Sequence, residues 1–138
     1  RVTASGMKLS MMIILGLAGA EGSERHALAT AKAINIIKPT HLSALCLMLY
    51  RGSELLDQYE AGKFNPLSPA GLMRELKLII ENIDLPADRH CLFRSNHVSN
   101  YVQLAATLPH DKQRLLRDID YSIAQLSKLK SWDVYNYN

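Results

Sequence analysis

The sequence has few cysteines and little excess charge of either sign. Its two cysteines, Cys46 and Cys91, form no CxxC or CxxxCxxC motif, so the sequence offers no pattern of its own for a structural zinc ion or an iron–sulfur cluster. Its 16 basic and 13 acidic residues leave a net charge of +3. That excess is too small to predict a nucleic-acid-binding face.

Long hydrophobic runs are also absent. The apolar segment 11–20 is about half the roughly 20 residues that a membrane-spanning helix needs, and no strongly basic leader precedes it. We therefore expect no membrane segment and no targeting segment. A composition of 48% hydrophobic and 21% charged residues is ordinary for a globular domain. It favours a cytoplasmic protein, although a Cys46–Cys91 disulfide stays open.

The first half of the chain has the pattern of a βαβ unit. Residues 9–15 form a nearly continuous apolar run, which is typical of a strand buried on both faces. A glycine-rich turn follows over 16–22, and Ser23 is a suitable N-cap for a helix that Pro39 ends. A second apolar run covers 42–49. The order strand, turn, helix, strand predicts a parallel pair with a right-handed crossover.

Cap and breaker residues predict the rest of the chain. The expected elements are a short helix over 54–61, a helix between Ser68 and Pro86, a short strand over 91–93, and a helix that begins at His110 or Asp111. We expect one unit over residues 1–131, followed by a frayed tail over 132–138. The predicted fold class is α/β, with parallel strands and covering helices.

Two features predict that the natural protein is longer. Residues 2–5 resemble the last turn of a helix with Gly6 as its αL cap, so we expect the chain to enter in the middle of an element. Two long strands also make a poor sheet, because their free edges would be exposed and apolar. We therefore expect the chain to pack its helices unusually or to form a dimer through a strand edge.

The turn after the first strand is the first candidate ligand site. In α/β folds ligands bind at the carboxyl ends of strands, where Gly16, Leu17 and Gly19 lie. The turn matches neither GxGxxG nor a P-loop, and a tight turn without a ligand is the alternative. His26, expected beside this turn near a helix N-terminus, would be held neutral for hydrogen bonding, or is simply a surface histidine. Arg51 follows the second strand at the same end.

A polar segment over 94–101 is the second candidate. Arg94, Asn96, His97 and Asn100 supply a basic group, two amides and an imidazole directly after a predicted strand, and such groups hold polar substrates or orient a proton donor. The alternative is a solvated loop with a helix cap. His97 together with nearby His90 and Cys91 fits no established zinc spacing, so we expect no metal site.

Taken in order, many segments resemble the second half of radical S-adenosylmethionine (radical SAM) enzymes. The similar branch is the one related to oxygen-independent coproporphyrinogen oxidases and elongator-type iron–sulfur oxidoreductases. The resemblance covers nearly the whole chain through residues 9–19, 23–31, 35–39, 45–50 and 53–55, then Phe93-Arg94-Ser95-Asn96-His97, Asn100, Leu108-Pro109-His110-Asp111-Lys112 and Ile119-Asp120.

This resemblance implies the last βα units of a partial TIM-like barrel. It implies S-adenosylmethionine and a [4Fe-4S] cluster in the full-length parent, with the CxxxCxxC loop upstream. The fragment alone is expected to bind neither group and to be inactive, and its substrate is unknown.

The resemblance also implies cofactor-side residues. Ile14 and Gly16 match the inner positions of the family's GxIxGxxE-like motif. Met12 and Gly19 replace its glycine and glutamate. The implied cofactor-side candidates are Ile14, Gly16, Leu17, Gly19, Leu45 and Cys46. The substrate-side candidates remain His26, Arg51, Arg94, Asn96, His97 and Asn100.

Two other functions stay open. The chain is alternatively a small α/β binding or regulatory module without catalytic activity, which would predict a stable monomer with no exposed strand edge. It is also alternatively a small transferase or hydrolase that uses the glycine turn and His26, although the sequence shows no evident pair of nucleophile and base.

Overall fold

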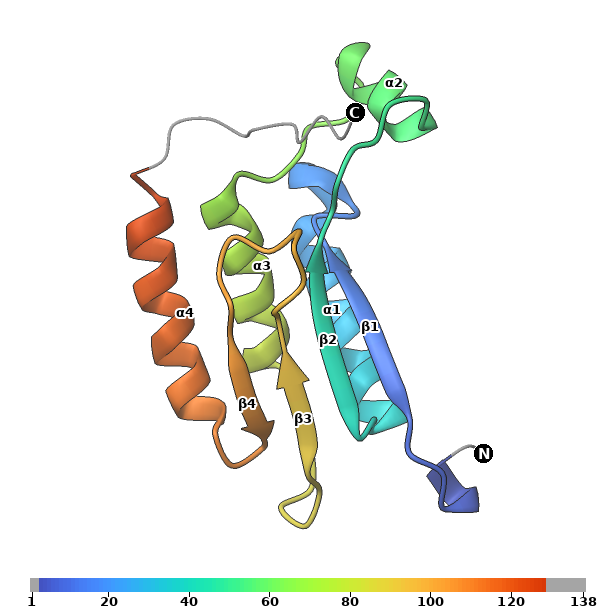
Figure 1. Ribbon diagram of the computed structural model, residues 1–138, viewed down its shortest axis with the longest axis vertical. Helices are drawn as coiled ribbons and strands as arrows, with labels where there is room; N and C mark the ends of the chain where they lie inside the picture. Colours follow the sequence, from blue (N-terminus) through green and yellow to red (C-terminus); the bar gives the residue numbers. More distant parts are fainter. Residues whose placement is uncertain (1–2, 129–138) are drawn as a thin grey trace.

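A computed structural model describes residues 3–128 as an α/β fold with one four-stranded sheet (Figure 1). The expected α/β class is confirmed. A short 3-10 helix over Thr3–Ser5 precedes the main elements. These are β1 (Ser10–Leu15), α1 (Gly19–Ile37), β2 (His41–Cys46), α2 (Glu54–Glu60), α3 (Pro69–Glu81), β3 (Cys91–Arg94), β4 (Ala105–Leu108) and α4 (Lys112–Leu126).

The sheet is mixed, with strand order β1-β2-β3-β4. β1, β2 and β3 run parallel, as the βαβ pattern predicts, but β4 pairs antiparallel with β3. The expectation of parallel strands alone was therefore wrong, and the sequence did not indicate β4. The reason is the connection between the last two strands. A loop joins them in place of a helix, and antiparallel neighbours need no crossover helix.

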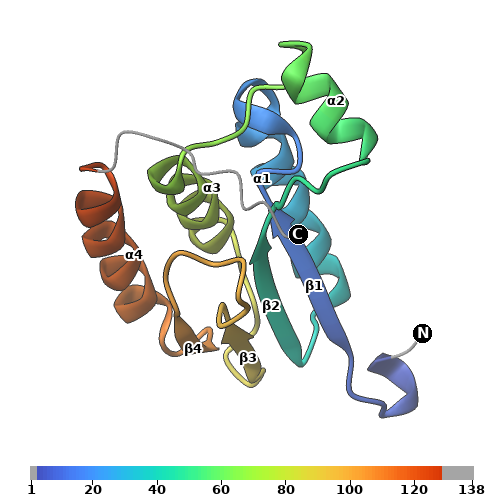
Figure 2. The ribbon, with the colours of Figure 1, turned by 45° about the horizontal axis from the view of Figure 1, so that its top comes forward.

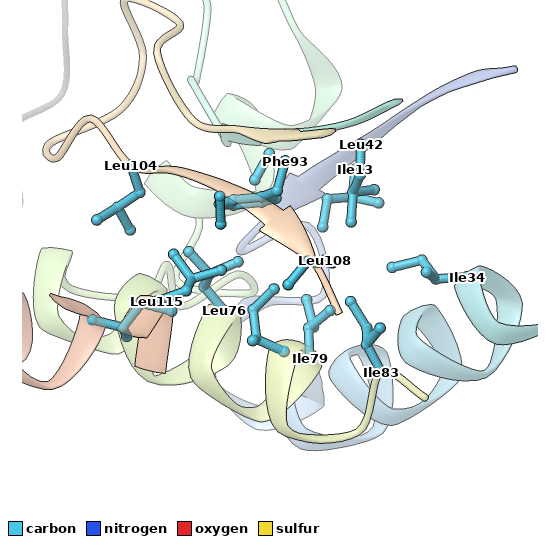
Figure 3. Packing of buried hydrophobic residues seen from close by; sticks show 14 of the residues in the cluster. Ile13, Ile34, Leu42, Leu76, Ile79, Ile83, Phe93, Leu104, Leu108 and Leu115 are labelled. Carbon is cyan, nitrogen blue, oxygen red and sulfur yellow. The ribbon is translucent and has the colours of Figure 1, made fainter. Parts of the chain in front are cut away.

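Helices α1, α3 and α4 lie on the same side of the sheet (Figures 1 and 2). The core lies between the sheet and these helices, where Phe93, Leu42 and Ile13 face residues of α1 and α3 (Figure 3). Phe93 and Leu42 are completely buried. This layer supports the strands from one side, and the candidate site lies at their carboxyl ends.

β1 is buried on one face only. Ile13 and Leu15 are buried, whereas Met12 is 71% exposed and Ile14 is 41% exposed. The prediction of a strand buried on both faces was wrong for this structure, because no described element covers the second face. The face of β1 that carries Met12 and Ile14 therefore stays open.

Serine side chains cap the N-termini of α2 and α3. Ser53 accepts a hydrogen bond from the N–H of Leu56, and Ser68 accepts one from the N–H of Gly71. Ser23 is not a cap, because α1 already begins at Gly19 and the Ser23 side chain contacts Glu75. Of the glycines over 16–22, Gly19 and Gly22 therefore lie in α1, and Gly16 precedes it.

Several predicted bounds differ from the structure by a few residues. The second strand ends at Cys46 and not at residue 49. Gly6, which follows the short 3-10 helix, has a φ of 81°. This left-handed conformation is the one expected for an αL cap. Asp111 precedes α4, in agreement with the predicted start. The predicted end of the unit at 131 and the frayed tail over 132–138 lie outside the described residues. Within residues 3–128, no helix is both long and apolar enough to cross a membrane.

Candidate functional site

A small pocket opens at the carboxyl ends of β1 and β2. It measures about 180 Å³ and is lined by Ile14, Leu45, Cys46, Leu47, Met48, Tyr50, His97 and Ser99. Ile14 and Leu45 are register partners on the two strands, so their side chains lie next to each other. Because alternate residues of a strand point to opposite faces, both leave the helix side. The pocket thus gathers three predicted cofactor-side residues and His97.

The loop between β3 and β4 is held against the edge of β2 by side chains. The Ser99 hydroxyl accepts a hydrogen bond from the N–H of Cys46 at 3.1 Å, and the Asn100 amide donates to the carbonyl of Ala44 at 2.8 Å. The register between β2 and β3 ends at Ser43 and Arg94. Ser99 and Asn100 therefore satisfy the backbone groups of β2 that a longer β3 would have paired. Asn100 and Ser99 serve the fold here; Ser99 lies within the predicted polar segment 94–101 but was not one of its named candidates.

The tautomer of His97 follows from its contacts with Ser99. Its Nδ1 lies 2.8 Å from the Ser99 hydroxyl and accepts the N–H of Ser99 at 3.1 Å. An imidazole nitrogen that accepts a hydrogen bond carries no proton, so in the neutral ring the proton is on Nε2. The exposed ring therefore presents a hydrogen-bond donor beside the pocket.

Replacing Ser99 with alanine is expected to lower the free energy of unfolding by about 1–3 kcal/mol, because the buried N–H of Cys46 loses its acceptor. Urea unfolding followed by circular dichroism measures the change. Val98→Ala is the control, since Val98 is 72% exposed and its truncation should change stability by less than about 0.5 kcal/mol. Equal effects of the two substitutions would contradict the proposed anchoring of the loop.

Both cysteines are free and buried. Burial raises the pKa of the Cys46 thiol to about 11; a backbone hydrogen bond from Tyr101 lowers it, and the negative charge of Glu75 raises it further. Burial likewise raises the pKa of Cys91 to about 11. Since metals and electrophiles react with the thiolate, neither group is prepared to bind a metal at neutral pH.

We expect iodoacetamide to label the folded chain about a hundredfold more slowly than the urea-unfolded chain at pH 8, because a raised pKa keeps the thiols protonated. The difference should shrink as the pH approaches 11, where the folded thiols ionise. Mass spectrometry of quenched samples measures both rates. Labelling of the folded chain as fast as the unfolded one would show that a thiolate is available.

The glycine turn after β1 has a conformation that favours glycine. Gly16 has a φ of +82°, and a Cβ at this position would lie 2.8 Å from Cδ2 of Leu72. Gly19 has a φ of +66°, and its N–H donates to the carbonyl of Gly16 at 3.0 Å. Leu17 between them is 49% exposed. The structure thus confirms a tight turn at the carboxyl end of β1, but its three candidates, Gly16, Leu17 and Gly19, do not line the pocket.

His26 lies behind this turn, against α3. Its Nδ1 is 3.1 Å from Oε1 of Glu75, and its side chain is 21% exposed. It borders a shallow groove of about 410 Å³ along β1, together with Ile14 and Leu17. His26 is therefore near the glycine turn, as expected, but it lies outside the pocket of His97.

Glu75 is the functional candidate that the sequence reasoning missed. Its carboxylate accepts a hydrogen bond from the N–H of Gly16 at 2.8 Å, and it also contacts the Ser23 hydroxyl. The residue is only 2% exposed. One available signal was its position among the apolar residues of α3, since a buried carboxylate needs partners.

The structure does not bring the other substrate-side candidates into the pocket. Arg51 and Asn96 are exposed in loops. Arg94 is exposed at the end of β3, and its guanidinium donates to the carbonyl of Phe93 at 2.7 Å. Of the polar segment 94–101, only His97 and Ser99 line the pocket.

No cluster of metal ligands is present between residues 3 and 128, where no three histidine, cysteine, aspartate or glutamate residues gather. The chain matches no family model, no curated protein and no solved structure. Among the described residues, the pocket and the glycine turn are the features that suit a ligand.

Proposed function

We propose that this chain is the C-terminal part of a radical SAM iron–sulfur oxidoreductase, and that its pocket receives the adenine end of S-adenosylmethionine. The observation that carries the proposal is the position of Ile14, Leu45 and Cys46. The resemblance implies that these residues, from two different strands, contact the cofactor, and they line one pocket.

The size and chemistry of the pocket suit one part of such a ligand. Sites for whole small molecules usually measure about 300–1,000 Å³, so a pocket of about 180 Å³ has room for a ring system and not for the complete molecule. Its lining carries no charged side chain: the Cys46 thiol is protonated, and Ile14 and Leu45 are apolar. Because an apolar wall disfavours charged groups, an uncharged aromatic ring is the best occupant.

The chain's own residues would bind and orient this ring. Ile14 and Leu45 would contact its faces and keep water away from it. The Nε2–H of His97 would donate to an acceptor on the ligand side of the pocket, which makes His97 the leading residue among the substrate-side candidates. Met12 and Ile14 on the open face offer no polar group to a reactive intermediate, which suits radical chemistry.

The iron–sulfur cluster does not fit the residues of this chain. Two separate buried thiols cannot replace a CxxxCxxC loop, so we propose that the cluster ligands lie elsewhere in the parent protein. When bound and reduced, the cluster would supply the electron that cleaves S-adenosylmethionine. The described chain would contribute one wall of the site.

The arrangement of the layers supports a partial TIM-like barrel as the parent fold. In such barrels parallel strands carry helices on the outside and leave the inner face to other side chains. Here helices cover one face of β1, β2 and β3, and the face with Met12 and Ile14 stays open. The antiparallel β4 departs from a regular barrel, so we propose that it closes the sheet at this end.

Filling the pocket tests the proposal in the protein encoded by the complete coding sequence. After anaerobic reconstitution, Ile14→Trp should lower S-adenosylmethionine binding at least about tenfold and leave the iron and sulfide content unchanged. Ile36→Trp is the control, because Ile36 on α1 is 72% exposed. A complete coding sequence without a cysteine triad, or equal binding by both variants, would contradict the proposal.

We also propose that the chain alone forms a dimer through the free edge of β1. Among the described residues β1 pairs only with β2, and exposed apolar edges pair readily. Light scattering should give twice the monomer mass of 15.5 kDa at high concentration. Met12→Lys should restore the monomer, whereas Met7→Lys, at an exposed position before the strand, should not. A monomeric wild-type chain would favour the binding-module alternative.

A further inference from the structure

One acidic side chain lies inside the apolar face of α3. Glu75 is 2% exposed and is flanked on the helix by Leu72, Leu76 and Ile79, which are at most 3% exposed. A carboxylate removed from water is costly unless hydrogen-bond donors replace the water. The donors that surround Glu75 therefore indicate its role.

Three donors from two other parts of the chain converge on this carboxylate. The N–H of Gly16 donates to Oε1 at 2.8 Å, the Ser23 hydroxyl contacts Oε2, and Nδ1 of His26 lies 3.1 Å from Oε1. A carboxylate has only acceptors, so Nδ1 of His26 carries a proton. Glu75 thus links α3 to the end of β1 and to α1.

A simple ion pair does not account for this arrangement. Among residues 3–128, no lysine or arginine forms an ion pair with Glu75. The basic side chain that contacts it is that of the partly exposed His26. The contact with Gly16 involves the backbone, in the turn itself. Where only packing is required, an apolar residue of similar volume would serve as well or better.

The turn that Glu75 holds adjoins the pocket. A Cβ at Gly16 would lie 3.7 Å from Cβ of Leu47, and Leu47 lines the pocket with Ile14. Cδ2 of Leu72, three residues before Glu75, would lie 2.8 Å from the same Cβ position. Two residues of α3 therefore contact the turn at Gly16: Glu75 accepts its N–H, and Leu72 packs against its Cα.

We infer that Glu75 is a positioning residue: its carboxylate sets the conformation of the glycine turn from behind and thereby fixes the pocket wall formed by Ile14 and Leu47. It acts through the N–H of Gly16, and Ser23 and His26 hold the carboxylate in place. A ligand in the pocket would contact Ile14 and Leu47, and neither the turn nor Glu75 itself.

The exchange rate of the Gly16 amide, measured by NMR on this chain, tests the inference. Glu75→Met should raise the exchange rate of this amide by about tenfold to a hundredfold, and by a larger factor than it raises the exchange rate of core amides such as that of Phe93, which report global unfolding. It should also shift the methyl signals of Ile14 and Leu47. Glu75→Gln retains an uncharged acceptor for the N–H of Gly16. In this variant the Gly16 amide should therefore exchange only about fivefold faster than in the wild type.

Glu81→Gln is the matched control, because Glu81 lies on the same helix with 43% of its side chain exposed. It should change none of these signals. If Glu75→Met does not fold, Glu75→Gln decides. An exchange rate of Gly16 within about twofold of wild type in the deciding variant would overturn the inference, since a merely structural acid would not protect this amide specifically.

Any effect of Glu75 on S-adenosylmethionine binding rests on the proposed function. In the reconstituted parent, Glu75→Met should raise the Kd for S-adenosylmethionine about tenfold at unchanged iron content. If the Gly16 amide exchanges faster in this variant but the Kd does not rise, the link between the turn and the cofactor would be overturned. Wild-type parent protein that binds no S-adenosylmethionine would remove the proposed function and leave the amide result valid.

Discussion

Replacing Phe93 with alanine is expected to lower the free energy of unfolding by about 3–5 kcal/mol, the largest effect in this chain, because the truncation leaves a cavity in the core. Phe93 is completely buried on β3 and faces α3 across the core (Figure 3). Its neighbours in the sheet, Leu42 and Ala106, are tied to it by strand register and cannot close the gap. Urea unfolding monitored by circular dichroism measures the loss.

The control for Phe93 is Tyr121→Ala, which removes an aromatic ring of similar size that is 69% exposed on α4. We expect it to change the free energy of unfolding by no more than about 0.5 kcal/mol. A Phe93→Ala variant as stable as Tyr121→Ala would mean that the sheet does not pack on the helices in this way.

Replacing Gly16 with alanine is expected to lower the free energy of unfolding by about 2–4 kcal/mol, since left-handed strain and a steric clash add together. The φ of +82° is unfavourable for alanine, and its Cβ would lie 2.8 Å from Cδ2 of Leu72. Leu72 is 3% exposed, so its side chain has little room to move. The same unfolding experiment gives the magnitude.

Gly52→Ala separates the two contributions. Gly52 has a nearly equal φ of +84° but no atom within 4 Å of an added Cβ, so only the strain of about 1–2 kcal/mol applies. If Gly16→Ala costs no more than Gly52→Ala, then Leu72 does not press on the turn and α3 does not support it as described.

Local signals in the sequence predicted most of the fold. Ser68 followed by Pro69 marked the start of α3, and continuous apolar runs marked β1 and β2. β4 was missed because Ala105–Leu108 is short and its pairing depends on β3, which a local pattern does not reveal. The burial of β1 was misjudged because an apolar run does not show whether a second layer covers it.

The start of α1 was misplaced for a tertiary reason. Glycines favour turns, so the helix was expected at Ser23. Contacts with a distant loop stabilise an earlier start, because the N–H of Ala20 donates to the carbonyl of Asn65 at 2.7 Å. No local pattern around Gly19 contains this contact.

The candidate site was predictable where it depends on strand ends. The rule that ligands bind at the carboxyl ends of parallel strands predicted the glycine turn after β1. Ile14, Leu45 and Cys46 were predicted only from the resemblance, and in the structure they line one pocket with His97. Glu75 was not predictable in its role, since its partner Gly16 lies 59 positions away in the sequence.

The formation of 5′-deoxyadenosine tests the central claim most directly. The protein encoded by the complete coding sequence would be reconstituted anaerobically with iron and sulfide, reduced with dithionite and incubated with S-adenosylmethionine. Chromatography with mass detection should show 5′-deoxyadenosine in the reduced, reconstituted sample and not without the cluster. A protein that assembles no cluster, or that assembles one and leaves S-adenosylmethionine intact, would contradict the proposed function.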